Sequence, residues 1–235
     1  MILSIIIPVY NESAYIKKVI DILYQINFPS YINNFELIIV DDASIDKSFK
    51  IVEKIAQQKK EIKLIGHLKN TGKGSAVKTA LKTSQGDLII VQDADLELSP
   101  YDIPLMIDYL MENKLEMVNG SRFKHKFKHK DNSNLRNIAN RVFSIIASIV
   151  VRKKITDLTC GYKLFTKNLK EAIGELEENK FGIEAELLIK AIKYNKFNVA
   201  EYPVSYSPRE IDEGKKIRAM DGFSILRTIF KYGLK

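Results

Sequence analysis

Short hydrophobic runs alternate with amphipathic segments along the first half of the chain. Four short apolar runs predict strands at 2–9, 36–40, 62–66 and 88–91, and the runs 36–40 and 88–91 predict buried strands. Apolar residues at helical spacing predict helices at 14–24 and 75–83, and a third helix is expected to open at 43–46 with Ser44 as its N-cap. Strands separated by helices indicate a mostly parallel sheet with helices on both faces, which binds ligands at the carboxyl ends of its strands.

The second half of the chain is less regular but carries the same two kinds of segment. The pattern predicts helices at 103–111, 135–151, 184–193 and 221–232. It predicts strands at 116–120, 162–165 and 198–204. With 235 residues, of which 46% are hydrophobic, the chain suits one α/β domain.

Charge and cysteine content narrow the class of protein. The net charge of +8 implies an anionic partner, which is nucleic acid, a phosphorylated substrate or a lipid surface. The single cysteine, Cys160, excludes a disulfide framework and a cysteine-based zinc site, and it fits a reducing cytoplasm. No apolar run reaches the roughly 18–20 residues of a membrane span, and the apolar N-terminus is interpreted as a strand rather than a signal peptide.

Acidic side chains follow two of the predicted strands. Asp93, Asp95 and Glu97 come after the strand at 88–91, where three carboxylates repel one another unless a partner neutralises them. Their oxygens suit Mg²⁺ or Mn²⁺ shared with substrate phosphates, although an acidic surface turn explains the spacing about as well. Asp41 and Asp42, after the second strand, suit a ribose or base edge, or equally a helix N-terminus that favours acids.

Basic and apolar segments suggest contacts with phosphate and lipid. The loop at 72–74 could bring backbone N–H groups and Lys73 near a phosphate, or form a tight turn before a helix. Alternating cations at 124–130 predict a surface loop that meets phosphate or anionic headgroups, with a solvated charge run as the alternative. The apolar run 142–151 has basic residues on both sides and suits an interfacial helix or a core helix; the segment 223–231 allows the same two interpretations.

Six motifs follow one another along essentially the whole chain: Pro8 to Glu12, Asp41 to Ser44, Asn70 to Gly74, Asp93 to Asp95, Gly120 to Arg122, and Asp157 to Lys163. Together they resemble the family 2 glycosyltransferases of the GT-A fold. Within that family the chain looks like the polyprenyl-phosphate glycosyltransferases, which include dolichyl-phosphate mannose synthase. The resemblance implies one GT-A domain with a Rossmann-like nucleotide-sugar-binding half at 1–98, an acceptor-binding half at 99–220 and a short amphipathic helix at 221–235.

The resemblance also implies roles for individual residues. The nucleotide sugar would be held by Pro8, Tyr10, Glu12, Asp41, Asp42, Lys73 and Asp93. The cofactor, Mg²⁺ or Mn²⁺, would be held by Asp93, Asp95 and Glu97, the last at a position where dolichyl-phosphate mannose synthases often have Gln. The acceptor phosphate would be held by Arg122, Arg136, Arg209 and Lys215, with Arg141 as an alternative to Arg136. The catalytic residues would be Asp95, Arg122 and Asp157, of which Asp157 would face the sugar.

The implied reaction moves a hexose from a UDP- or GDP-sugar to dolichyl or undecaprenyl phosphate, with inversion at the anomeric carbon. A lipid phosphate is already an anion at neutral pH, so it needs cations and alignment rather than a strong base. The alternative is a soluble or growing glycan acceptor, which would need a carboxylate base, with Asp157 as the candidate. Nucleic acid is not expected as a partner, because no recognition motif is visible and Trp is absent.

Many relatives of this kind carry transmembrane helices after the catalytic domain, whereas the printed sequence reaches Lys235 without them. We therefore expect a peripheral enzyme on the cytoplasmic face of the cell membrane. It would meet an anionic membrane surface through 142–151 and 223–230. A membrane-anchored partner subunit is compatible with this arrangement.

Overall fold

The computed structural model describes residues 1–124, 134–193, 197–209 and 219–234, apart from the side chains of 134–136 and 219–221. Its strands are β1 (Ile2–Val9), β2 (Asn34–Asp41), β3 (Ile62–Gly66), β4 (Leu88–Val91), β5 (Met117–Ser121), β6 (Lys163–Thr166) and β7 (Val199–Pro203). Its helices are α1 (Ile16–Gln25), α2 (Ser48–Ala56), α3 (Lys73–Thr83), α4 (Asp102–Glu112), α5 (Asn134–Val151), α6 (Lys167–Ala172), α7 (Ile183–Lys193) and α8 (Ala219–Gly233). Every predicted strand and helix is present, three of the strands (β1, β3 and β4) with the predicted ends and the other elements with shifted ends. The six-residue α6 was not predicted.

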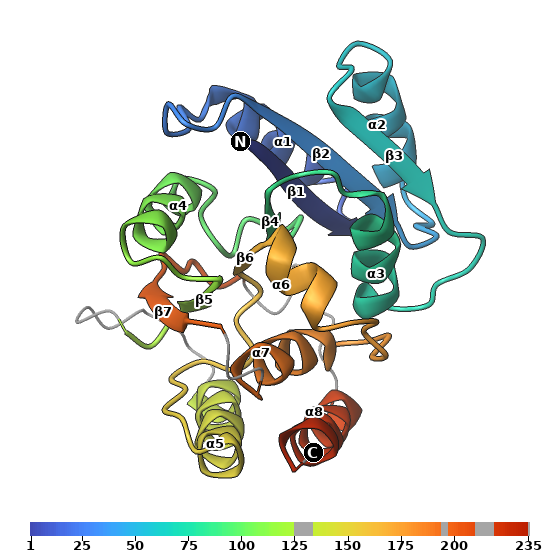
Figure 1. The fold of residues 1–235 in the computed structure, drawn as a ribbon. Helices are drawn as coiled ribbons and strands as arrows, with labels where there is room; N and C mark the ends of the chain where they lie inside the picture. The colour runs from blue at the N-terminus through green and yellow to red at the C-terminus, as the bar shows by residue number, and fades with distance from the viewer. Residues whose placement is uncertain (125–133, 194–196, 210–218, 235) are drawn as a thin grey trace.

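The seven strands form one sheet in the order β3-β2-β1-β4-β6-β5-β7 (Figure 1). Strand β1 is parallel to β2 and β4, β2 to β3, and β5 to β7, whereas β6 is antiparallel to both of its neighbours. Because Val91 pairs with Lys163, the start of β6 lies beside the carboxyl end of β4. The reversal brings the segment before β6 to the edge where the acids after β4 lie. The predicted α/β class with a mostly parallel sheet is confirmed.

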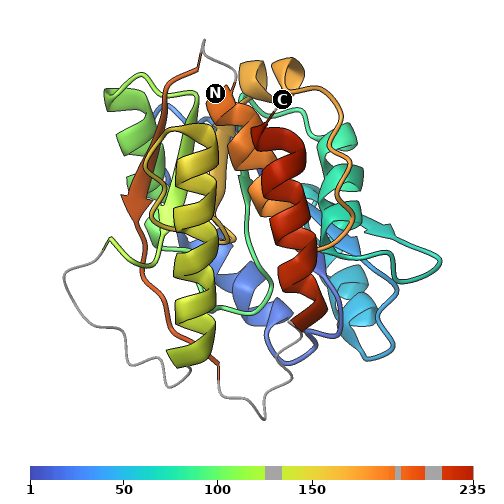
Figure 2. The same cartoon turned by 90° about the horizontal axis from the view of Figure 1, so that it is seen from below.

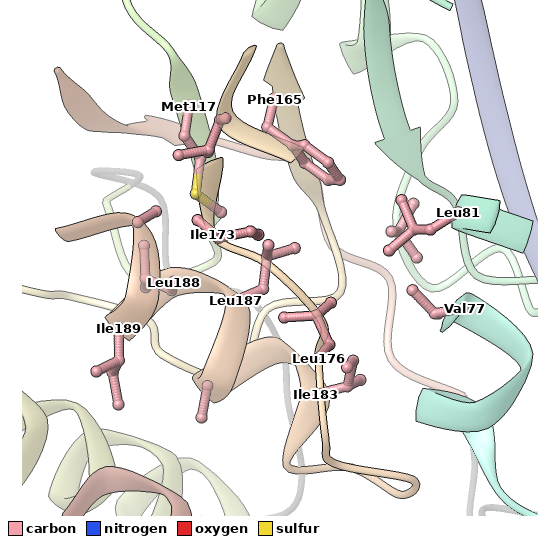
Figure 3. Packing of buried hydrophobic residues seen from close by; sticks show 14 of the residues in the cluster. Val77, Leu81, Met117, Phe165, Ile173, Leu176, Ile183, Leu187, Leu188 and Ile189 are labelled. Carbon is pink, nitrogen blue, oxygen red and sulfur yellow. The ribbon is translucent and has the colours of Figure 1, made fainter. Parts of the chain in front are cut away.

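Alternate strand residues pack against opposite layers of helices. Ile5 and Ile7 face α1, α2 and α4, whereas Ile6 belongs to the core under α3, α5, α7 and α8. Figure 3 shows part of this second core, where Met117 and Phe165 from the sheet lie near side chains of α7 and α3. Burial of one such side chain contributes about 1.5–3 kcal/mol. Helices on both faces explain why the strands are uninterrupted apolar runs.

The helix expected at 43–46 begins later, and the predicted N-cap Ser44 is wrong. Helix α2 starts at Ser48, and its N-cap Lys47 makes no side-chain capping bond. Ala43 has a φ of 60°, which turns the chain out of the helical path. Ser44 instead joins two loops, because its N–H donates to Asp41 Oδ1 at 2.8 Å and its hydroxyl accepts from the N–H of Asn11 at 2.9 Å.

Helices α5 and α8 lie side by side on the outside of the molecule (Figure 2). Each has one buried face, with Ala147 of α5 and Ile229 of α8 fully buried. Each also exposes large apolar side chains: Ile138, Val142, Ile145 and Ile149 on α5, and Phe223 and Phe230 on α8. The core-helix interpretation is correct for the buried faces, and the interfacial interpretation stays a prediction for the exposed faces. Within the described ranges, no helix is long and apolar enough to cross a membrane.

Candidate active site

Most of the predicted site residues lie around the carboxyl ends of β1, β2 and β4 and the start of β6. Pro8 is in β1, Tyr10 follows it, and both are partly exposed. Three non-glycine residues with positive φ follow these strands, namely Asn11, Ala43 and Leu96. Such conformations cost of order 1 kcal/mol or more each. They turn the chain sharply after each strand and keep the acidic side chains of the three loops together.

Asp41 and Asp42 are neighbours in the sequence but have different surroundings. One oxygen of Asp41 accepts the Ser44 N–H, while Oδ2 is buried without a hydrogen-bond partner. Asp42 accepts from the N–H groups of Thr71 and Gly72, at 3.0 and 2.7 Å, and from the Thr71 hydroxyl. Its Oδ1 also lies 2.7 Å from Nδ1 of His67. Asp42 therefore holds the 67–72 loop, and Asp41 keeps a free acceptor.

The glycine loop before α3 packs against protein rather than forming an open phosphate cradle. Its first N–H groups bind Asp42, and the N–H of Ser75 donates to the carbonyl oxygen of Asn179 at 3.0 Å. Gly72 has a φ of 102°, and a Cβ at Gly72 or Gly74 would lie 2.4 Å from a backbone oxygen of 178–179. Of the two sequence interpretations, the tight turn before a helix is the one that the structure contains.

Lys73 connects two carboxylates from distant parts of the chain. Its Nζ lies 2.5 Å from Oδ1 of Asp93 and 2.6 Å from Oε1 of Glu184, in the first turn of α7. Burial opposes the charged form, but Asp93 and Glu184 outweigh it and raise the pKa of Lys73. Glu184 was not predicted as a site residue, because an acid at the start of a helix is ordinary. Lys73 therefore links the end of β4 to α7.

Arg209 lies on the carboxylates that were predicted to bind the donor and the metal. Its guanidinium is 3.0 Å from both Glu12 Oε2 and Asp95 Oδ2, and its backbone N–H donates to Glu97 at 3.1 Å. Burial, followed by the charges of Asp93 and Glu97, raises the pKa of Asp95 to about 6, with Arg209 acting in the opposite direction. The resemblance implies a contact between Arg209 and the acceptor phosphate. In the structure Arg209 lies on Glu12 and Asp95, which are predicted to bind the donor and the metal.

The acids after β4 are of the ligand type that a divalent cation prefers, but their side chains do not converge on a common position. Among the described residues, no three His, Cys, Asp or Glu side chains are arranged to hold a metal ion. Asp93 turns to Lys73, whereas Asp95 and Glu97 turn to Arg209. Carboxylate oxygens are the ligands that Mg²⁺ and Mn²⁺ prefer, so the residue types fit such an ion. In this structure Lys73 and Arg209 occupy the acids instead.

Arg122, directly after β5, and Asp157, in the segment before β6, form a two-point ion pair. The Nε of Arg122 donates to Oδ2 at 2.7 Å and its Nη2 to Oδ1 at 2.8 Å, while Nη2 also donates to Thr159. Asp157 is fully buried, and Arg122 is 14% exposed. Burial opposes the charge of Arg122, but Asp157 raises its pKa above the ordinary value. Asp157 is thereby held at both carboxylate oxygens by Arg122.

Glu201 supports the Asp157 loop from behind and was not predicted. Its carboxylate accepts from the N–H groups of Thr156 and Asp157, at 3.0 and 3.2 Å, and from Asn119. Arg141, the alternative to Arg136, stacks its guanidinium over Phe123 at 4.8 Å from the ring centre. The side chain of Arg136, all of Lys215 and the basic loop from 125 to 130 lie outside the described residues.

The fold is that of the GT-A glycosyltransferases. A solved structure with this architecture is glucosyl-3-phosphoglycerate synthase from Mycobacterium tuberculosis in complex with Mn²⁺, UDP-glucose and phosphoglyceric acid. It superposes with a TM-score of 0.70, covering 98% of this chain and 79% of that one. At 17% sequence identity the likeness concerns the fold alone.

The chain belongs to glycosyl transferase family 2, whose sequence signature matches residues 4–174. It is 25% identical to the glycosyltransferase AglD of Haloferax volcanii over 96% of this chain, which spans only 36% of that protein. It is 29% identical to the UDP-N-acetylglucosamine–dolichyl-phosphate N-acetylglucosaminyltransferase of Methanococcus voltae, covering 95% of this chain and 93% of that enzyme. It is 31% identical to the dolichyl-phosphate β-glucosyltransferase of Dictyostelium discoideum, with 98% and 74% covered.

These comparisons confirm the predicted family and the enzyme class, which is a glycosyltransferase. Two of these relatives are named for transfer to dolichyl phosphate, in line with the predicted subfamily. The roles of individual residues in this chain stay predictions.

Proposed function

We propose that the protein transfers a hexose from a nucleotide sugar to a polyprenyl phosphate, with inversion at the anomeric carbon. A phosphate oxygen of the acceptor attacks the anomeric carbon while the bond from that carbon to the donor's diphosphate breaks. The nucleoside diphosphate leaves as the anion. No proton has to be removed from the attacking group, because the acceptor is ionised at neutral pH.

The observation that carries this proposal is the two-point ion pair between Arg122 and Asp157. A hydroxyl acceptor needs a carboxylate that can accept its proton. Asp157, the candidate for that role, is buried and bound at both oxygens by Arg122. Protonation of Asp157 would leave Arg122 as an unpaired buried charge, which is costly. A phosphate acceptor avoids this cost and gains a nearby guanidinium for binding.

The unpartnered Oδ2 of Asp41 supports the nucleotide side of the proposal. A buried acceptor without a donor costs about 1–3 kcal/mol, so a ligand that donates to it gains affinity. A base N–H or a ribose hydroxyl is such a donor, and the position at the end of β2 is where nucleotide-binding sheets hold these groups.

Mg²⁺ or Mn²⁺ would be held by Asp95, with Asp93 and Glu97 from the same loop. When bound, such an ion stabilises the negative charge of the leaving diphosphate. Lys73 lies at the same loop through Asp93 and would share in holding the diphosphate. Arg209 has to leave Asp95 for this arrangement, since it lies at hydrogen-bonding distance from that carboxylate.

The exposed apolar residues of α5 and α8 support action at a membrane surface. Ile138, Val142, Ile145 and Ile149 follow one stripe along α5, and Phe223 and Phe230 lie on the neighbouring α8. Basic residues accompany the stripe, among them Arg141, Arg152 and Lys153. Apolar area together with cationic charge is what binds an amphipathic helix to an anionic surface. The cytoplasmic side of the membrane belongs to the same proposal.

A panel of radiolabelled UDP- and GDP-sugars, offered with a short-chain polyprenyl phosphate, tests the proposal and names the donor. We expect a labelled product that extracts into organic solvent, forms with Mg²⁺ or Mn²⁺, and disappears with EDTA. NMR of the product should show the inverted anomer. Donor hydrolysis that needs metal but gives no lipid product would move the acceptor to a soluble glycan and contradict the lipid-phosphate proposal.

A further inference from the structure

A cavity of about 540 Å³ is lined by residues between Phe123 and Glu201, and none of its lining residues has a role in the reaction described above. Its lining residues come from β7, the segment after β5, the segment after α5, and α7. Three of its lining residues are lysines: Lys124, Lys153 and Lys154. Most of the others are apolar, including Ile155, Leu188, Ile192 and Val199.

Two of these lysines are fixed along the outer edge of β7. The ammonium of Lys153 donates to the carbonyl oxygen of Val199, and that of Lys124 to the carbonyl oxygen of Glu201, each at 2.9 Å. The two carbonyls are two residues apart on one strand, a spacing of about 6.6 Å. An ammonium has three N–H donors, so each lysine keeps two for a ligand.

Two ammonium groups held on alternate carbonyls of one edge strand suit a phosphate group. Hydrogen bonds from an ammonium to a phosphate oxygen are about 2.8 Å long, and a phosphate offers a separate oxygen to each lysine. The one acidic side chain among the described lining residues is Glu201. Its oxygens accept from Thr156, Asp157 and Asn119, so its charge is directed to the protein interior.

The apolar floor distinguishes the cavity from a surface cluster of lysines. Leu188 is buried, Ile155 is nearly so, and Ile192 is partly exposed, so the floor offers hydrocarbon contacts below the cations. The cavity adjoins the end of α5, whose exposed stripe ends at Ile149. The lysines at the opening of the cavity complement an anionic headgroup. The apolar residues below them and the exposed face of α5 complement hydrocarbon chains, so the site as a whole suits an anionic amphiphile.

We propose that this cavity binds the phosphate headgroup of an anionic membrane phospholipid. The inference rests on the proposed membrane association but not on the transfer reaction. Lys124 and Lys153 hold the phosphate, and the floor formed by Ile155 and Ile192 receives the start of a hydrocarbon chain. The site would fix the protein on the membrane next to the Asp157 loop, because Thr156 and Glu201 are among its lining residues.

Vesicle binding of the whole protein, measured without donor or acceptor, tests the proposal. The vesicles contain phosphatidylcholine with or without phosphatidylglycerol. We expect the double variant Lys124→Gln/Lys153→Gln to lose about 30-fold in affinity for phosphatidylglycerol vesicles, at about 1 kcal/mol per lysine. Both lysines are exposed, so thermal unfolding should stay close to that of the unchanged protein.

The matched control is Lys50→Gln/Lys54→Gln, which removes the same charge from exposed positions on α2. We expect less than a twofold loss for it, and an equal loss in both double variants would overturn the proposal. Ile192→Trp fills the floor without changing charge and should also weaken binding. A last experiment measures thermal unfolding with inorganic phosphate. If phosphate stabilises the protein through these lysines while the protein shows no preference for phosphatidylglycerol vesicles, the site binds a free anion and the lipid assignment is overturned.

Discussion

Arg209 Nη2 lies 3.0 Å from Oδ2 of Asp95, so a basic side chain of the chain itself neutralises the carboxylate that is predicted to bind the metal. The same guanidinium lies 3.0 Å from Glu12. In this state Arg209 and a divalent cation compete for one position. Binding of the metal and the donor would release Arg209, which could then meet the acceptor phosphate as its sequence context suggests.

Arg209→Gln should therefore raise affinity for Mn²⁺ in the absence of donor, by about tenfold if the pair is worth ~1.4 kcal/mol. Transfer activity should fall, because the freed guanidinium is missing. Titration calorimetry of the donor-free protein measures the affinity. Arg227→Gln is the charge-matched control, since Arg227 is 62% exposed and distant from β4. Weaker Mn²⁺ binding by Arg209→Gln would mean that Arg209 orders the metal ligands instead of competing with the metal.

Asp41→Asn and Asp42→Asn should separate ligand binding from stability. In Asp41→Asn the unpartnered oxygen can become an N–H donor, so affinity for the nucleoside diphosphate should fall about 10- to 100-fold with little change in unfolding. In Asp42→Asn the hydrogen bonds to Thr71 and Gly72 weaken, so the free energy of unfolding should fall by about 2 kcal/mol. Calorimetric binding and denaturant unfolding of both variants check this. Equal effects on both measurements would contradict the division of roles.

Removing one partner of the Arg122–Asp157 pair should destabilise the protein strongly. Breaking a buried ion pair costs about 3–5 kcal/mol, because the remaining charge is left unpaired. Arg122→Leu and Asp157→Leu should each show this loss in urea unfolding, and the double variant should lose clearly less than their sum. Strict additivity would show that the two residues are not coupled.

Gly74→Ala should cost about 1–3 kcal/mol through overpacking, because the new Cβ would lie 2.4 Å from the carbonyl oxygen of Glu178. Gly174→Asn is the control. Gly174 has a φ of 66° but nothing within 4 Å of a Cβ, and Asn tolerates this conformation. Thermal unfolding compares the two. A Gly74→Ala variant as stable as the control would place the 178–180 segment further from α3.

The exposed stripe of α5 should act in membrane binding and not in folding. Ile145→Ser/Ile149→Ser should weaken binding to anionic vesicles by at least tenfold, since each side chain brings about 1 kcal/mol or more of apolar transfer free energy. Stability should hardly change, because both residues are already exposed. Leu105→Ser on α4, at a position 51% exposed, supplies the control. Vesicle co-sedimentation that is unchanged by the α5 variant would contradict a membrane role for this face.

The first half of the sheet could be predicted from the sequence because its strands β1, β2 and β4 are buried on both faces. Runs such as Leu88 to Val91 carry no polar residue, and only a sheet between two layers of helices accommodates them. The start of α2 could not be predicted, since the positive φ at Ala43 depends on contacts with the loop at Asn11. The antiparallel direction of β6 could not be predicted either, because a strand between two neighbours is equally apolar whether it runs parallel or antiparallel to them.

The candidate site was predictable as a set of residue types but not as a set of contacts. The acids and arginines after the strands were found through motif order. Their pairing was not, because Arg209 and Glu12 are nearly the whole chain apart. Glu184 and Glu201 were missed for the same reason, since only the fold brings them to Lys73 and to the Asp157 loop. The division into a donor half and an acceptor half stays a prediction.

The distance along the sequence between β4 and its neighbour β6 has a consequence for synthesis on the ribosome. Strand β4 lies between β1 and β6, and β6 follows β4 by about 70 residues. At translation rates of about 5–20 residues per second, one edge of the apolar β4 would wait roughly 4–14 s for its partner. An unpaired apolar edge invites pairing with other chains. Yield in a cell should therefore depend on chaperones that shield nascent chains, and slowing translation between β4 and β6 should increase aggregation.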